Sequence, residues 1–202
     1  MIERYPGALW VGSPYHGSRD GIAPEAVVLH IAEGTLHGVD SWFNSLNASV
    51  SAHFCVGKDG SVHQYVELGR AAWANGVVEP GAPAALVAEN AGINPNKWTV
   101  AIEHEGYHYE TPTDAQIEAS ERLTAWLFKE VLLPGSATGV ALDRKHILRH
   151  ADISPVTRKN CPGWSEGILG DYIADTQELL APTFDPRIIQ ARDLLNAVIE
   201  GL

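Results

Sequence analysis

The chain has 202 residues, of which 45% are hydrophobic, so it is long enough to bury the core of one domain. Its 25 acidic residues outnumber its 14 basic residues, for a formal net charge of -11, and no basic block stands out. This balance argues against a nucleic-acid partner, because such proteins present clustered lysine and arginine.

The amino terminus lacks the basic start and long apolar run of a signal peptide. No segment approaches the roughly 20 apolar residues of a membrane span. The two cysteines, Cys55 and Cys161, are too few for a disulfide scaffold. We therefore expect a protein that is made in the cytoplasm, does not span a membrane and needs another route if it acts outside.

Strand-like and helical patterns alternate along the first half, which predicts an α/β fold. Residues 1–24, rich in proline and glycine, are expected to be irregular. Residues 25–31 predict a buried strand with His30 at its end, and Thr35 is positioned to cap a following helix. Lys58-Asp-Gly60 lies between two strand-like runs and predicts a hairpin.

In the second half, residues 74–96 predict a long surface loop bordering a groove, and residues 98–104 predict another strand. Thr113-Asp-Ala-Gln116 matches a capping box that opens a helix. A short strand at Ile147-Leu148 then leads into His150.

The sequence predicts a domain over residues 1–181 and a helical tail over residues 182–202. From Asp185 onward the tail has apolar residues at helical spacing. A helix with one apolar face normally packs on a core, so we expect it to dock on the domain.

Three residues carry the chemistry of a metal site. His30 ends one predicted strand, His150 follows another, and Cys161 lies eleven residues further on. Two imidazoles and one thiolate form the ligand set of a zinc site that keeps its fourth position open for water. A histidine on an apolar strand is often only a hydrogen-bonded core residue, so the spacing by itself leaves both interpretations open.

Five short sequence motifs in a fixed order favour the metal-site interpretation over that of a core histidine. They are Val28-Leu-His30, Ser51-Ala-His-Phe54 with Lys58-Asp-Gly60, Ala72-Trp73, Val100-Ala-Ile-Glu103, and His150 through Gly163. Together they resemble the zinc-dependent N-acetylmuramoyl-L-alanine amidases of the type 2 class, the group related to phage T7 lysozyme and peptidoglycan recognition proteins. The resemblance covers roughly residues 25–165.

The resemblance implies a central mixed β-sheet flanked by helices, with Zn2+ at one end of the sheet on His30, His150 and Cys161. It implies hydrolysis of the amide bond between N-acetylmuramic acid and the L-alanine of the peptidoglycan stem peptide. Relatives that only recognise peptidoglycan lack the third ligand, so Cys161 favours catalysis.

The resemblance also assigns catalytic roles. Glu103 is expected to act as general base toward the attacking water and then to protonate the leaving amine. Glu105, two residues on, remains a competitor for this role. Lys159 is expected to stabilise the oxyanion, with Arg158 as a less favoured substitute.

Two nearby positions carry weaker interpretations. His53 is expected to be a structural residue or a partner of a ligand rather than a ligand itself. Many relatives show Trp-His-Ala-Gly where this chain has Trp73-Ala-Asn-Gly76. Asn75 is therefore a candidate for hydrogen bonding to substrate.

A short amidase without a signal peptide or a wall-binding repeat resembles a phage or prophage endolysin that reaches the cell wall after release. Its partner would be peptidoglycan or a muropeptide, and a monomer is expected. Three alternatives remain: a cytoplasmic enzyme that recycles anhydro-muropeptides, a peptidoglycan-binding module without turnover, and a zinc hydrolase of a different amide.

Overall fold

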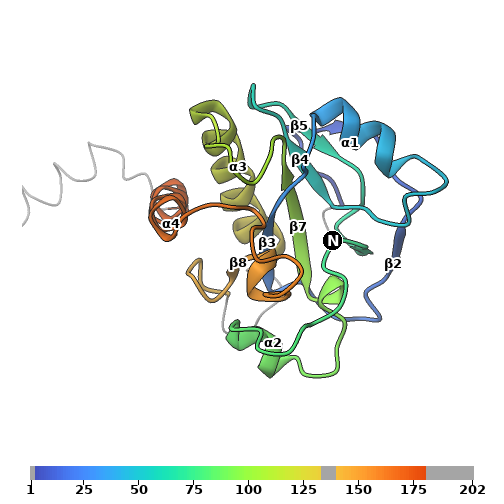
Figure 1. Cartoon of the computed structure of the whole chain (residues 1–202), viewed down its shortest axis with the longest axis vertical. Helices are drawn as coiled ribbons and strands as arrows, with labels where there is room; N and C mark the ends of the chain where they lie inside the picture. Colours follow the sequence, from blue (N-terminus) through green and yellow to red (C-terminus); the bar gives the residue numbers. More distant parts are fainter. Residues whose placement is uncertain (1–2, 133–139, 181–202) are drawn as a thin grey trace, which may run out of the picture.

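Strands that lie far apart in the sequence assemble into one central sheet. The computed structural model describes residues 3–132 and 140–180, and Figure 1 shows the sheet at the centre of the molecule. The strand order is β1-β5-β4-β7-β3-β8. The strand bounds are Leu9–Trp10 for β1, Ala26–Ile31 for β3, Phe54–Val56 for β4, Val62–Gln64 for β5, Thr99–His104 for β7 and Ile147–Arg149 for β8.

Four neighbouring strands of this sheet are parallel. β7 pairs with β4 on one side and with β3 on the other, and β3 pairs with β8. β4 and β5 form an antiparallel hairpin, and β1 runs parallel to β5. A separate antiparallel sheet joins β2 (His16–Ser18) to β6 (Arg70–Ala72). The central sheet is mixed, as the sequence predicts.

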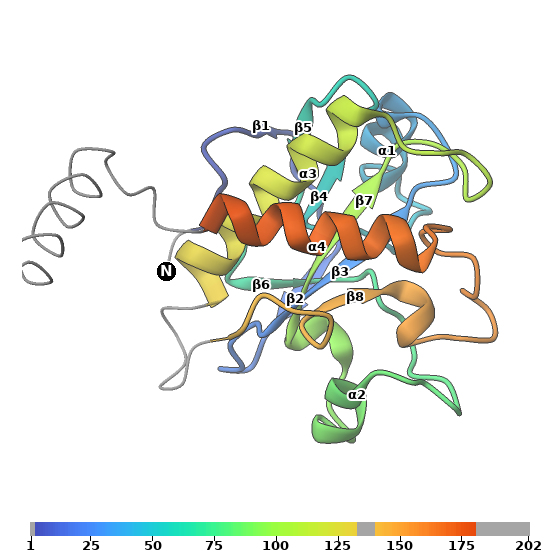
Figure 2. The same ribbon diagram turned by 90° about the vertical axis from the view of Figure 1, so that its left-hand side faces the viewer.

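Helices cover both faces of this sheet. α3 and α4 lie across one face (Figure 2), and α1 packs on the other (Figure 1). Within residues 3–132 and 140–180, no helix is both long and apolar enough to cross a membrane. The helix bounds are Leu36–Phe43 for α1, Ala85–Glu89 for α2, Asp114–Leu127 for α3 and Glu166–Leu180 for α4, with a π-helical turn at Phe128–Leu132 and 3-10 turns at Pro95–Lys97 (η1) and His150–Asp152 (η3).

The alternation of side chains along β3 divides the core. Val27 and Leu29 join the large cluster beneath α3 and α4, whereas Val28 packs with Leu86 and Trp98 on the opposite face. Successive residues of a strand point to opposite faces, so His30 continues the Val28 side. The core therefore directs His30 away from α3 and α4.

Three local predictions are confirmed. The Thr35 hydroxyl accepts a hydrogen bond from the amide of Gly38 at the start of α1, and the Thr113 hydroxyl accepts one from the backbone amide of Gln116 at the start of α3. Thr113 thus caps α3 as expected, but the capping box is incomplete because the Gln116 side chain donates to the carbonyls of Val56 and Glu105 instead. Gly60 adopts a φ of 84° in the β4–β5 turn, a conformation that glycine enters at little cost.

Other expectations need correction. Residues 1–24 are not wholly irregular, because β1 and β2 form by pairing with strands far along the chain. Residues 74–96 contain α2 and the start of η1 rather than a continuous loop. α4 was not anticipated, since Gly167 and Gly170 weaken its helical signal. The tail predicted over residues 182–202, with its docking, lies outside the described residues.

We predict that Glu121, buried on α3, makes the protein less stable as the pH rises. Burial, then the charges of Asp175 and Glu118, raises the pKa of its carboxyl to about 7, and its Oε1 has no hydrogen-bond partner among the described residues. The folded state holds this proton more tightly than the unfolded state, so stability falls between about pH 4.5 and 7.

Thermal unfolding of Glu121→Gln should therefore show a higher Tm than the native protein at pH 8 and a much smaller difference at pH 4. Glu178→Gln, the same change at an exposed position of α4, is the control. A Glu121→Gln protein less stable than native at pH 8 would contradict this account.

Candidate active site

The parallel pairing of β3 with β7 creates the site. His30 lies opposite Glu103 in this register, one position from the end of each strand. His150 follows directly after β8, the strand on the other side of β3. Parallel strands end at the same edge of a sheet, and ligands of α/β proteins commonly bind there.

The three predicted metal ligands converge at this edge. One ligand atom from each of His30, His150 and Cys161 lies within 4.8 Å of the other two. Cys161 Sγ is 4.0 Å from His30 Nδ1, and the two imidazole rings are 4.4 Å apart between centroids. Tetrahedral zinc with bonds of about 2.0–2.3 Å spaces its ligands about 3.5 Å apart, so a small inward movement would close the site.

The chemical states of these groups suit a divalent cation. Burial lowers the pKa of His30 far below its usual range, and burial with the nearby charge of Arg158 lowers that of His150 to about 4. Both imidazoles are therefore neutral near pH 7, with a lone pair available. Burial raises the pKa of Cys161, so this thiol needs a positive charge beside it to ionise.

Glu103 borders the same three side chains. Its Oε1 lies 4.0 Å from His30 Nδ1, whereas its buried Oε2 has no hydrogen-bond partner among the described residues. Burial raises the pKa of Glu103 to about 8, and the charge of Arg158 acts in the opposite direction. A carboxylate held like this is available to exchange a proton with a small molecule in the pocket.

The neighbours of Glu103 are engaged elsewhere. The carboxylate of Glu105 accepts a hydrogen bond of 2.8 Å from the amide of Lys58 in the β4–β5 turn. His104 projects to the opposite face, where Nδ1 donates to the His30 carbonyl and Nε2 accepts from the Ser120 hydroxyl. Of these three consecutive residues, Glu103 is the one that lines the pocket.

Ion pairs and backbone bonds hold the segment from His150 to Cys161. Asp152 accepts from the amide of Arg149 at 2.7 Å and is bound by the guanidinium of Arg144. The amide of Ala151 donates to the carbonyl of Cys161, which ties the two ends of the segment together. This closed loop therefore positions two of the three predicted ligands, His150 and Cys161, relative to each other.

Lys159 and Arg158 are both exposed on this loop and both line the pocket. Arg158 is the cation whose charge lowers the pKa of Glu103 and His150. The structure therefore brings both predicted cations to the site.

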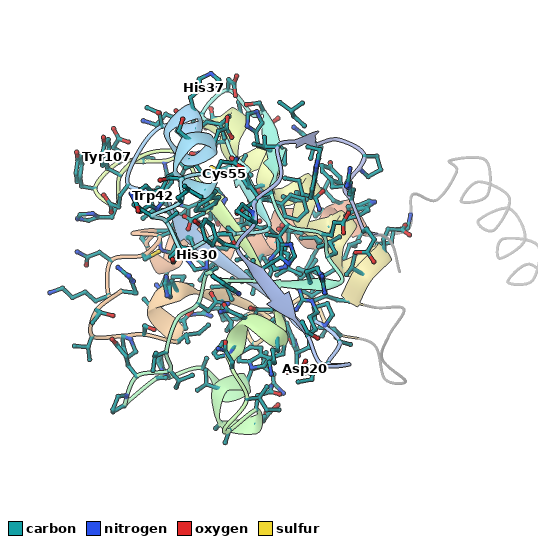
Figure 3. All side chains as sticks on the ribbon, turned by 90° about the vertical axis from the view of Figure 1, so that its right-hand side faces the viewer. Asp20, His30, His37, Trp42, Cys55 and Tyr107 are labelled. Atoms are coloured by element: carbon teal, nitrogen blue, oxygen red, sulfur yellow. The ribbon has the colours of Figure 1, made fainter. Side chains whose placement is uncertain are left out.

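The pocket has a volume of about 780 Å³ and walls of different character. Trp42 on α1 and Trp73 are half-exposed on its apolar side, and Arg158, Lys159 and Asn160 form the polar side. In Figure 3, Trp42 lies next to His30. Trp42 therefore forms part of the pocket wall.

The expected role of the 74–96 segment is only partly correct. Ala74 lines the pocket, but the residues that follow support the site loop from behind. The carbonyl of Val77 accepts from the Ser154 hydroxyl, and the Glu79 carboxylate accepts from the amide of Val156 and from Thr157. The main contribution of the 74–96 segment is therefore to hold the loop that forms the polar wall, and it contributes little to the wall itself.

Asn75 is the residue whose role the sequence suggested wrongly. It is fully buried, and its Oδ1 lies 3.0 Å from His30 Nε2, so its side chain is already committed within the protein. The usable signal was that a metal-binding histidine needs a partner for its other nitrogen. His53 is structural, as expected, because Nδ1 accepts from the amide of Ala101 and Nε2 donates to the carbonyl of Arg70.

A family model described as N-acetylmuramoyl-L-alanine amidase matches residues 20–164. The chain belongs to this family. The match contains His30, Glu103, His150, Lys159 and Cys161, and so covers the whole candidate site. The family match therefore spans five of the six strands of the central sheet and the candidate site at its edge.

Known proteins agree with this assignment. The chain is 33% identical over 102 residues to N-acetylmuramoyl-L-alanine amidase A of Achromobacter lyticus, a stretch that covers 49% of this chain and 48% of that protein. The chain thus spans about half the length of this curated relative.

Solved structures share the fold of this amidase-family chain. A selenomethionine derivative of AmpD superposes with a TM-score of 0.64 at 23% identity, covering 85% of this chain and 97% of that one. A mutant endolysin from Bacillus subtilis gives a TM-score of 0.56 at 15% identity, covering 83% and 96%. The endolysin amidase LysCS from Clostridium intestinale gives 0.51 at 16%, covering 84% and 97%.

We predict that Gly163→Ala distorts the candidate site. Gly163 adopts a φ of 85°, and a Cβ there would lie 2.1 Å from the carbonyl oxygen of His108. The unfavourable φ and the forced backbone shift should together lower the free energy of unfolding by about 3 kcal/mol.

Urea unfolding would measure this loss. The control is Gly170→Ala in α4, where nothing lies within 4 Å of the added Cβ and the substitution should stabilise the helix by up to about 1 kcal/mol. Equal stability of Gly163→Ala and the native protein would contradict the clash.

Proposed function

We propose that the protein is a zinc-dependent hydrolase that cleaves the amide bond between N-acetylmuramic acid and the L-alanine of the peptidoglycan stem peptide. One observation carries this proposal: two neutral imidazoles, one thiol and the carboxyl group of Glu103 meet at the end of an open pocket, and Oε2 of that carboxyl group has no hydrogen-bond partner among the described residues. A site that only bound a structural ion would not need the carboxylate.

His30, His150 and Cys161 would hold the metal. When bound, zinc would polarise the scissile carbonyl and make water a nucleophile near neutral pH. Two imidazoles and one thiol are groups that zinc prefers as ligands, so these residues fit the metal. The amide of Ile31 also donates to Cys161 Sγ at 3.4 Å, which favours the thiolate form that binds zinc. Three protein ligands leave a position for water or substrate.

Glu103 is proposed as the group that moves the proton. It would accept a proton from the attacking water through its free Oε2 and return it to the nitrogen of the leaving L-alanine. Its raised pKa supports the second half of this role, because the protonated form that donates to the leaving amine is accessible near neutral pH. For the first half, the positive charge of a bound zinc ion would lower this pKa and favour the carboxylate that accepts the water proton. Glu105 is a poorer candidate because it is held by the Lys58 amide.

Lys159 is proposed to stabilise the negative charge that develops on the carbonyl oxygen. Its support is its place in the pocket wall, two residues before Cys161. Arg158 would act on the same pocket mainly through its charge on Glu103 and His150. The sugar and the stem peptide would lie between this wall and the indole rings of Trp42 and Trp73.

For the biological role we propose a monomeric endolysin, made in the cytoplasm and acting on the cell wall after release. The alternative is a cytoplasmic enzyme that acts on soluble anhydro-muropeptides. Both use the same bond cleavage and the same residues, so the choice depends on whether the pocket accepts intact wall. The assay below therefore includes both substrates.

The purified protein with zinc should release free stem-peptide amino groups from bacterial wall. EDTA should abolish this release and added zinc should restore it, because the donor set is proposed to act only with the metal. Cys161→Ala and His150→Ala should be inactive, whereas Cys55→Ala, at the other, fully buried cysteine, should retain activity.

No release by the zinc-loaded native protein would leave a peptidoglycan-binding module. Faster turnover of soluble anhydro-muropeptide than of intact wall would favour the recycling role. A mass spectrum of the digest separates the proposed bond from any other amide.

Replacement of Glu103 by glutamine should reduce the rate about a hundredfold or more while leaving the bound zinc unchanged, since general-base loss has this scale. Steady-state rates and metal content would be measured on the same preparation. Glu105→Gln is the matched control and should be close to native. If Glu105→Gln were the slow variant instead, the base would be Glu105.

A further inference from the structure

Asn75 lies behind the proposed metal site and ends a chain of buried hydrogen bonds. Its Oδ1 is 3.0 Å from His30 Nε2, and its Nδ2 is 2.5 Å from the hydroxyl of Thr99. The Thr99 hydroxyl is in turn 2.7 Å from the carbonyl of Pro95. Asn75 and Thr99 are buried, so water does not compete for these bonds.

The donor and acceptor of each hydrogen bond can be assigned by starting from the last group of the chain, the Pro95 carbonyl. The Pro95 carbonyl can only accept, so the single hydroxyl hydrogen of Thr99 is donated to it. The Thr99 oxygen is then left as an acceptor for the Asn75 amide NH2. That orientation turns the Asn75 carbonyl oxygen toward His30. Because this oxygen also only accepts, His30 Nε2 must carry the hydrogen.

We propose that Asn75 is a positioning residue that holds His30 as the Nε2–H tautomer and thereby presents the lone pair of Nδ1 to the metal. Nδ1 is the nitrogen that faces the site, at 4.0 Å from both Cys161 Sγ and Glu103 Oε1. This inference rests on the proposed function, since it assigns a role toward the zinc ion. It adds Asn75, Thr99 and Pro95 to the residues on which the site depends.

The turn that carries Pro95 is itself held rigidly. The Asn96 side chain accepts hydrogen bonds from the amides of Asn75 and Ala74, at 2.7 and 3.2 Å. The buried guanidinium of Arg19 donates to the carbonyl of Lys97 at 2.8 Å. The backbone of Asn75 and its side-chain partner Thr99 are thus anchored to one short turn, η1, which limits rotation of the amide.

The side chain of Asn75 supplies the acceptor that this arrangement needs. An alanine at this position would offer His30 no side-chain acceptor. A neutral amide also orients the imidazole without adding a second negative charge beside Cys161. Such a partner typically contributes 10–100-fold to metal affinity.

The test combines 15N NMR of the histidine rings in metal-free protein with zinc affinity measured by chelator competition. The native protein should show His30 as the Nε2–H tautomer near pH 7. Asn75→Leu, which keeps the branched shape but removes the acceptor, should lose this preference and bind zinc about 10–100-fold more weakly.

Thr99 provides a matched pair of variants that leave Asn75 in place. Thr99→Ser keeps the hydroxyl and should behave as native, whereas Thr99→Val removes it, lets the Asn75 amide turn over and should weaken zinc binding with a mixed His30 tautomer. A merely structural role for Thr99 would change stability in Thr99→Val without altering the tautomer.

Two results would overturn the proposal. One is a native His30 that carries its hydrogen on Nδ1, and the other is native zinc affinity in Asn75→Leu or Thr99→Val. The tautomer of His30 is measured without metal or substrate, so this measurement tests the role of Asn75 separately from the proposed function. Absence of zinc binding by the native protein would refute the proposed function and its zinc-directed part, whereas a wrong tautomer would refute only the role of Asn75.

Discussion

The parallel register between β3 and β7 is the constraint on which the site depends, because it sets His30 beside Glu103. The register is held by the apolar residues that precede them, with Val27 and Leu29 in the core beneath α3 and α4. A slip of one residue would turn every side chain of the strand to the other face and place His30 in that core. Hydrophobic packing thus determines the geometry of the polar site.

The polar groups collected at this edge are costly for the metal-free protein. Burial depresses the pKa of both imidazoles, raises that of Cys161 and raises that of Glu103 to about 8, so each group is held away from its charged form. A divalent cation would reverse this balance at the thiol and stabilise the folded state by mass action. Functional sites commonly lower the stability of the folded protein, because the groups that catalysis needs are not those that stabilise the fold best.

Around these groups the protein has built rigid supports from neighbouring loops. Asp152 joins Arg149 and Arg144 behind His150, and Glu79 bonds to the loop that leads to the cations. On the other side, η1 holds Asn75 against His30. His30 and the loop that leads to the cations are therefore supported by residues from distant parts of the chain, Asn75 and Glu79.

The sequence by itself determined the α/β class, the β3 and β7 strands and both threonine caps, because these depend on local periodicity and capping. An ordered series of motifs also predicted the candidate set His30, His150, Cys161, Lys159 and either Glu103 or Glu105. It could not determine β1 and β2, because these strands are stabilised by pairing with strands far along the chain. It also could not determine α4, because Gly167 and Gly170 weaken the helical signal of that segment. Only the tertiary structure placed Glu103, and not Glu105, in the pocket wall and showed that Asn75 contacts His30 from within the protein. Both decisions depend on which distant group meets a side chain, and that information exists only once the chain has folded.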